Sequence, residues 1–127
     1  MNTSKGILYW SPRILCILSI LFLTIFSFDV FEGEASFWSK LVDFFIHNIP
    51  AIILSAVLVF AWKKERIGGL AFLILGIVFG AFVFYHNYIV NRFDFWNCLW
   101  IVLIIAFPFI IVGLLFLAHA RQEQKLQ

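Results

Sequence analysis

Two histidines in apolar stretches are the residues of this 127-residue chain best suited to chemistry. His47 and His86 are each followed by an asparagine, and Asp43 lies one helical turn before His47 on the same face. Two imidazoles beside a carboxylate could bind a divalent metal, ligate haem, relay protons or contact a quinone headgroup. The alternative is that histidine and asparagine only hydrogen-bond between helices, because the sequence places no third or fourth ligand near them.

Other recognisable catalytic or metal-binding patterns are absent from the sequence. It contains no Ser/His/Asp order, G-x-S-x-G, H-E-x-x-H or glycine-rich phosphate loop. Cys16 and Cys98 stand outside any C-x-x-C or Cys/His spacing that would hold zinc. His119 is expected near the carboxyl end of a helix and the lipid headgroups, and to belong to no site. We therefore expect a protein that is not an enzyme and that has no metal site and no cofactor.

Composition indicates which medium surrounds the chain. Hydrophobic residues make up 64% of it, aromatic residues 20% and charged residues 13%, roughly half the charge of an ordinary soluble domain. So small a body cannot bury that much apolar surface in water, so we expect the lipid bilayer to be its surroundings. The net charge of +2, without a basic block, argues against nucleic acid as a partner.

Four apolar segments must position these residues, and each has the roughly 20 residues that a helix needs to cross a bilayer. Ser11 and Pro12 form a typical helix start, which predicts that the first helix begins there. Ser36 or Ser39 could begin the second. The connections are short, so residues 1–127 form a single domain. The sequence predicts an all-α, antiparallel bundle of four transmembrane helices near residues 12–31, 43–62, 67–90 and 96–118.

The basic residues predict the orientation. Seven of the nine Lys and Arg residues fall on the side that carries both termini, and only Lys40 and Arg92 fall on the other. Both termini should therefore face the cytoplasm of a multi-pass protein of the bacterial plasma (inner) membrane. Cys16 and Cys98 then lie near opposite faces, so we expect no disulfide between them.

Helix contacts can also be predicted. Only residues 63–66 join the second and third helices, which should form an antiparallel hairpin. Pro50 and Pro108 should each kink a span, because proline removes a backbone donor and crowds the carbonyl four residues back. One face of the third helix carries a stripe of small or polar residues, on which a neighbouring helix should pack. The stripe consists of Gly69, Gly76, Gly80 and Asn87, and Asn87 should hydrogen-bond across the contact.

A competing interpretation makes residues 1–35 a cleaved secretory signal, with basic residues, an apolar run and small residues near Gly33. The apolar run is long for a signal, so we expect this segment to be retained as the first helix.

Four short patterns cover much of the chain. They are Trp10-Ser11-Pro12-Arg13-Ile14-Leu15, Phe28-Asp29-Val30-Phe31, His47-Asn48-Ile49-Pro50 and Trp62-Lys63-Lys64-Glu65-Arg66-Ile67-Gly68-Gly69. Together they resemble a family of small bacterial four-helix membrane proteins catalogued only as a domain of unknown function. The resemblance implies a bacterial inner membrane and four spans, and it carries over no site residues.

These observations favour a small, non-enzymatic integral membrane protein that acts as a structural, accessory or interaction subunit. It would pack on itself as a homo-oligomer or on a larger membrane partner. The alternative is a redox protein of haem or quinone, or a metal- or ion-binding protein, that uses His47 and His86 near the outer face.

Overall fold

The computed structural model describes residues 3–126, and this part of the chain is helical almost throughout. The predicted all-helical fold is confirmed, and the described residues contain no strand. The elements are α1 (Thr3–Ser27), a 3-10 turn η1 (Phe28–Glu32), α2 (Phe37–His47), α3 (Ile49–Lys63), α4 (Glu65–Tyr85), a π-helical turn η2 (His86–Val90), α5 (Phe95–Ile105) and α6 (Phe107–Lys125).

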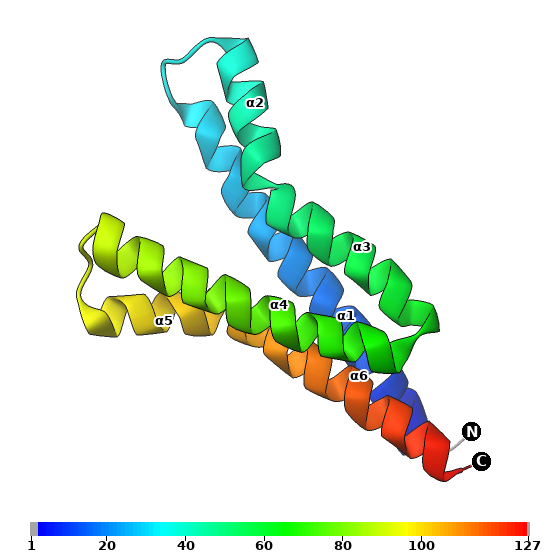
Figure 1. Ribbon diagram of the computed structural model, residues 1–127. Coiled ribbons are helices and arrows are strands. Elements are labelled where there is room, and N and C mark those ends of the chain that lie inside the picture. The colour runs from blue at the N-terminus through cyan, green and yellow to red at the C-terminus, as the bar shows by residue number, and fades with distance from the viewer. Residues whose placement is uncertain (1–2, 127) are drawn as a thin grey trace.

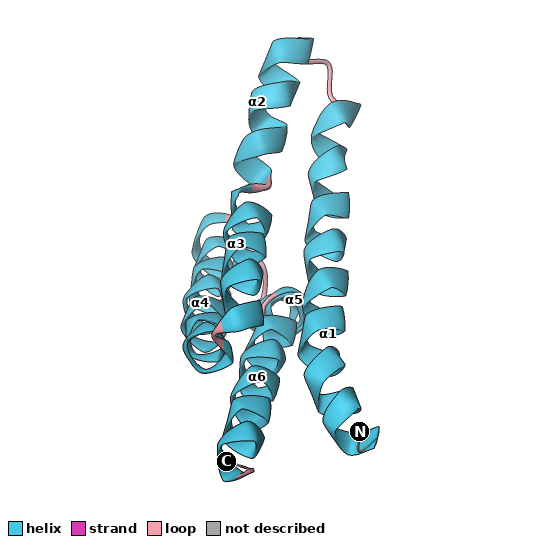
Figure 2. Ribbon diagram, turned by 90° about the vertical axis from the view of Figure 1, so that its right-hand side faces the viewer, coloured by secondary structure: helices cyan, strands magenta, loops and turns pink. Residues whose placement is uncertain are grey.

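The helices form two arms that meet at one end (Figure 1). The first arm consists of α1, α2 and α3, and the second consists of α4, η2, α5 and α6. The arms converge where the two chain termini and the α3–α4 turn lie, which we call the closed end, and they diverge toward the other end (Figure 1). Figure 2 views the second arm nearly along its length, with α4 beside α3. The antiparallel contact expected between the second and third predicted helices is the packing of α3 on α4.

Two of the predicted helices are bent, as their prolines indicated. The axes of α2 and α3 differ by 42°, and those of α5 and α6 by 41°. The breaks fall at Asn48 and Ala106, each two residues before a proline, so the predicted kinks at Pro50 and Pro108 are confirmed. Two helices, Gly6–Ser27 and Glu65–Val90, are long and apolar enough to cross a membrane, or up to four segments if each bent pair is one span.

The first helix begins earlier than predicted. α1 starts at Thr3 and contains Pro12 in its interior, so the expected start at Ser11 and Pro12 is wrong. The Ser11 hydroxyl donates back to the carbonyl of Ile7 one turn earlier, and therefore does not cap a helix. α1 also ends at Ser27, where the 3-10 turn takes over. The Ser36 hydroxyl accepts the Ser39 backbone N–H at 3.3 Å and caps α2, so the predicted start at Ser36 is confirmed, although the helical segment begins before the predicted bound at residue 43.

The glycine stripe of α4 lies against α6 and the end of α5. A Cβ built on Gly69 would lie 3.0 Å from the carbonyl oxygen of Gly113, and one on Gly76 would lie 2.8 Å from Cγ1 of Ile110. One on Gly80 would lie 3.3 Å from the Cβ of Ala106. The backbones of α4 and α6 thus approach as closely as small residues allow.

Asn87 differs from the prediction, because its side chain does not reach across this contact in the structure. Its amide nitrogen donates to the Val83 carbonyl at 2.9 Å, and its amide oxygen accepts from Asn91 at 3.0 Å. The π-helical turn that begins at His86 places the residue after the regular part of α4, so the seven-residue spacing from Gly80 no longer keeps it on the stripe.

Candidate functional site

A cluster of charged side chains lies at the closed end, and its centre is Arg13. This side chain projects from α1 and is fully buried, with 0% of its surface exposed. Its Nη2 donates to Oε1 of Glu65 at 2.6 Å and to the carbonyl of Trp62 at 3.4 Å, while Nη1 donates to the Tyr9 carbonyl. A buried guanidinium is tolerated only when it is paired and hydrogen-bonded, and Glu65 supplies the opposite charge.

Aromatic rings enclose the same guanidinium. Its central carbon lies 3.7 Å from the ring centre of Tyr9, 5.0 Å from Trp62 and 5.2 Å from Phe116. The negative faces of aromatic rings attract a cation within about 6 Å, most strongly where water is excluded. The three rings come from α1, α3 and α6, so the charge of Arg13 also joins these helices.

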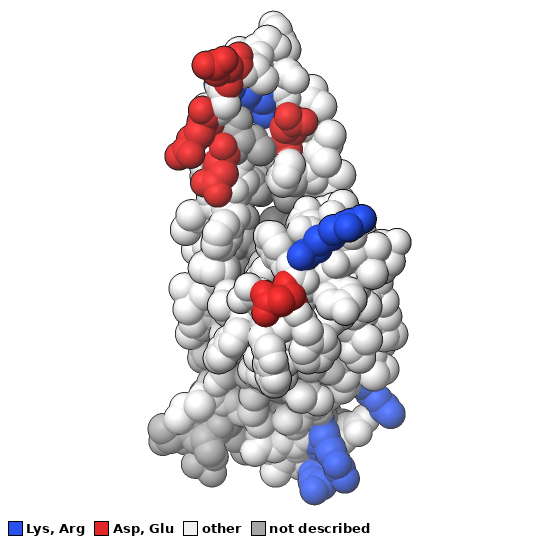
Figure 3. Space-filling model, turned by 90° about the vertical axis from the view of Figure 1, so that its left-hand side faces the viewer, with Lys and Arg blue, Asp and Glu red and all other residues white. Residues whose placement is uncertain are grey.

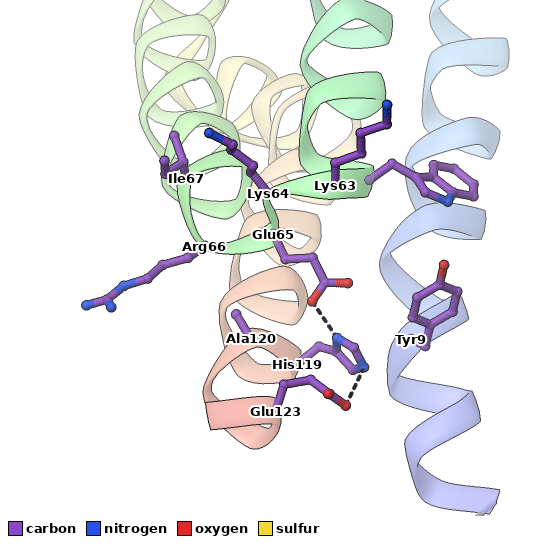
Figure 4. A pocket seen from close by; sticks show the side chains of 10 residues that line it. Tyr9, Lys63, Lys64, Glu65, Arg66, Ile67, His119, Ala120 and Glu123 are labelled. Carbon is purple, nitrogen blue, oxygen red and sulfur yellow. Dashed lines mark hydrogen bonds and ion pairs between the residues drawn. The ribbon is translucent and has the colours of Figure 1, made fainter. Parts of the chain in front are cut away.

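His119 extends the cluster to α6. Its Nδ1 lies 2.6 Å from Oε2 of Glu65, and its Nε2 lies 3.8 Å from Oε1 of Glu123 (Figure 4). The His119 side chain is 7% exposed and that of Glu123 52%, so the chain of charges runs from the interior to water. Arg13, Glu65, His119 and Glu123 are called the ion cluster below.

Glu65 is the residue that connects the cluster. It begins α4 directly after the short α3–α4 turn, so its carboxylate faces both α1 and α6. One of its oxygens binds Arg13 and the other binds His119. A single carboxylate therefore joins three helices, and both of its oxygens are occupied.

A hollow of about 660 Å³ opens beside the ion cluster. Tyr9, Glu65, His119 and Glu123 are among its lining residues, and Figure 4 shows the side chains of Glu65 and His119 directed toward each other. The basic side chains of the turn point away from the cluster in the same view. The cluster thus places an imidazole between a mostly buried carboxylate and an exposed one.

The two histidines predicted as a site are not brought together. His47 lies at the end of α2, and its Nδ1 donates to the Asp43 carbonyl of its own helix at 2.8 Å. His86 lies at the end of α4, where its ring stacks on Phe82 with centres 6.0 Å apart. α2 belongs to the first arm and the end of α4 to the second, and the arms have diverged at this level (Figure 1). Within residues 3–126, no three His, Cys, Asp or Glu side chains are grouped to hold a metal.

The ion cluster was missed by the sequence interpretation. His119 was expected to belong to no site, which is wrong, because it contacts Glu65 and stands edge-on to the ring of Tyr9. From the sequence, Arg13 counts only among the basic residues on the side of the termini, and Glu65 only within the 63–66 connection. One signal in the sequence could have pointed to this pair. Arg13 lies in the pattern Trp10–Leu15 and Glu65 in the pattern Trp62–Gly69, and each pattern begins with a tryptophan.

The fold and the cluster define an all-helical protein whose apolar helices are long enough to cross a membrane two to four times, as far as residues 3–126 show. The chain belongs to the family described as Domain of unknown function (DUF7670), whose model matches residues 1–127. The predicted membership of an uncharacterised family is thereby confirmed. No curated protein and no solved structure matches the chain.

Proposed function

We propose that this chain is a multi-pass protein of the bacterial inner membrane with four spans and both termini in the cytoplasm. The two bent pairs then each count as one span, beside α1 and α4. Both termini lie at the closed end (Figure 1). Lys and Arg side chains occupy that end in Figure 3, whereas acidic side chains gather at the opposite end around the α1–α2 connection. This distribution is the one that the positive-inside rule favours.

Within that membrane we propose a non-enzymatic accessory role, in which the protein packs on a second copy or on a larger membrane partner. The observation that carries this proposal is an apolar cleft between the arms. The cleft has a volume of about 260 Å³ and lies between α3 and α4. Its walls are entirely apolar and consist of Ile49, Pro50, Ile53, Leu54, Leu75, Gly76, Val78, Phe79, Phe82 and Phe109.

The cleft exists because polar side chains join the two arms at the closed end only. The ion cluster joins α1, α4 and α6 at the closed end, whereas no comparable polar contact joins the arms further along, among the hydrogen bonds and ion pairs of the described residues. α3 and α4 share a tight turn in which a Cβ on Gly68 would lie 2.2 Å from that of Ala61, and they separate beyond it. The protein thus has a fixed base and an unfilled space whose chemistry suits an apolar helix of a partner.

A photocrosslinking experiment tests this proposal. A photoreactive residue at Val78, which lines the cleft and is 60% exposed, should form a crosslink to a protein of defined mass in native membranes. The matched control is Ile25 on α1, which is 65% exposed and lies outside the cleft, and should react with lipid only. The mass of the product separates a second copy from a different partner. Crosslinks to lipid alone from both positions, together with a monomeric mass in mild detergent, would contradict the proposal.

A further inference from the structure

A second hollow, of about 280 Å³, lies at the closed end on the outer side of the α4–α6 contact. Its lining combines polar and apolar side chains: Arg66 from the first turn of α4, and Leu117, Ala120, Arg121 and Gln124 from α6. It is distinct from the ion cluster, because Arg66 points away from Glu65 and His119 in Figure 4.

Within residues 3–126, neither arginine of this hollow forms an ion pair with a carboxylate. In the part of the chain that the structure describes, ion pairs involve Arg13, Glu65, His119 and Glu123 only. Arg66 and Arg121 are both exposed, and their guanidinium groups are free to bind an anion. A guanidinium group can donate two parallel hydrogen bonds to two oxygens of one phosphate, and the Gln124 amide adds a further donor.

The apolar side chains of the hollow identify which kind of phosphate fits. Leu117 lies one helical turn before Arg121 on α6, toward the apolar middle of the helix, so the basic groups stand above an apolar wall. Trp62 lies in the last turn of α3, across the α3–α4 connection from Arg66, and marks the level expected for the headgroups. An anion that has a hydrocarbon tail would contact both the basic and the apolar side chains of the hollow. A free phosphate ion would contact only the basic ones.

We propose that Arg66, Arg121 and Gln124 bind the phosphate of one anionic phospholipid of the inner leaflet, whose acyl chain lies along Leu117. This inference rests on the membrane placement and orientation proposed above, and is independent of the accessory role. Basic pockets between helices on the cytoplasmic side are recognised binding places for anionic headgroups.

Native mass spectrometry of the full chain in mild detergent tests the site, because detergent removes the general attraction of a charged bilayer surface. One phosphatidylglycerol molecule should remain bound per chain, with phosphatidylcholine retained far less. The double variant Arg66→Gln/Arg121→Gln should weaken retention roughly thirtyfold, the loss expected for two cations beside a lipid phosphate. The matched control Lys63→Gln/Lys64→Gln removes two charges from the adjoining turn, outside this hollow, and should reduce retention less than about fivefold.

Three results would overturn the site. An equal loss in both double variants would show diffuse attraction to any basic residue of the closed end. Displacement of the lipid by inorganic phosphate would show a free-anion site. Equal retention of phosphatidylcholine would show an apolar contact without headgroup recognition. Circular dichroism of each variant confirms folding, and sedimentation of the chain with membranes tests the proposed membrane placement separately.

Discussion

The carboxylate of Glu65 and the imidazole of His119 are 2.6 Å apart, although 53 residues separate them in the chain. The other oxygen of Glu65 is 2.6 Å from the guanidinium of Arg13. Arg13 is buried completely, so most of its compensation comes from this one carboxylate. The stability of the closed end should therefore depend on Glu65 more than on any other acidic residue of the cluster.

Glu65→Gln tests this dependence. Removal of the negative charge leaves the Arg13 cation buried without a counter-charge, which should lower the free energy of unfolding by about 3 to 5 kcal/mol. Thermal or denaturant unfolding in detergent measures the change. The control is Glu123→Gln, whose side chain is 52% exposed and should cost less than about 1 kcal/mol. Equal effects of the two variants would contradict the central position of Glu65.

His119→Ala should act through the same carboxylate. The variant leaves Oε2 of Glu65 without its donor in a mostly buried position, and the expected cost is about 1 to 3 kcal/mol. In a double-mutant cycle with Glu65→Gln, the combined loss should fall short of the sum of the single losses by at least about 0.5 kcal/mol. Strictly additive losses would mean that the two side chains do not depend on each other.

Gly113→Ala tests the close contact between α4 and α6. The added Cβ would lie 2.7 Å from the carbonyl oxygen of Gly69, so a backbone must shift, and we expect a loss of about 1 to 3 kcal/mol. Gly33→Ala is the matched control, because no atom lies within 4 Å of its Cβ position. Unfolding followed by circular dichroism compares the two. A stability of Gly113→Ala equal to that of Gly33→Ala would refute the close approach.

Accessibility labelling tests the proposed orientation. A membrane-impermeant maleimide should react with Glu34→Cys from outside intact spheroplasts, and should leave Lys64→Cys unmodified until the membrane is opened. The native Cys16 and Cys98 are both buried, so they give little background. The reverse pattern would invert the proposed topology.

The histidine alternative can be tested by spectroscopy. Because His47 and His86 lie on separate arms, we expect the purified protein to show no Soret band and no stoichiometric metal. A band or metal content that disappears in His47→Ala or His86→Ala would instead establish a cofactor that the two residues bind.

Local features of the sequence predicted much of the fold. The length and apolar character of the segments indicated helices, Pro50 and Pro108 indicated the bends, and the short 63–66 connection indicated the α3–α4 hairpin. Each of these depends on residues close together in the chain, where steric rules act directly.

The ion cluster could not be found in the same way. A charge at the end of an apolar run normally lies at the membrane surface, and the predicted first helix, which begins at residue 12, places Arg13 at such an end. In the structure, α1 begins ten residues earlier and places Arg13 inside the bundle. Its partner Glu65 is 52 positions away, and only the packing of α1 on the α3–α4 hairpin makes the pair.

The two bends carry a consequence for the bilayer. Bends of 42° and 41° occur one in each arm, and the arms open toward the end opposite the termini (Figure 1). In the proposed orientation the molecule is a wedge, narrow in the inner leaflet and broad in the outer. A protein of this shape occupies a larger area in the outer leaflet than in the inner one. The angle between its arms should therefore change with the local curvature of the membrane, and a change in that angle should in turn bend the membrane.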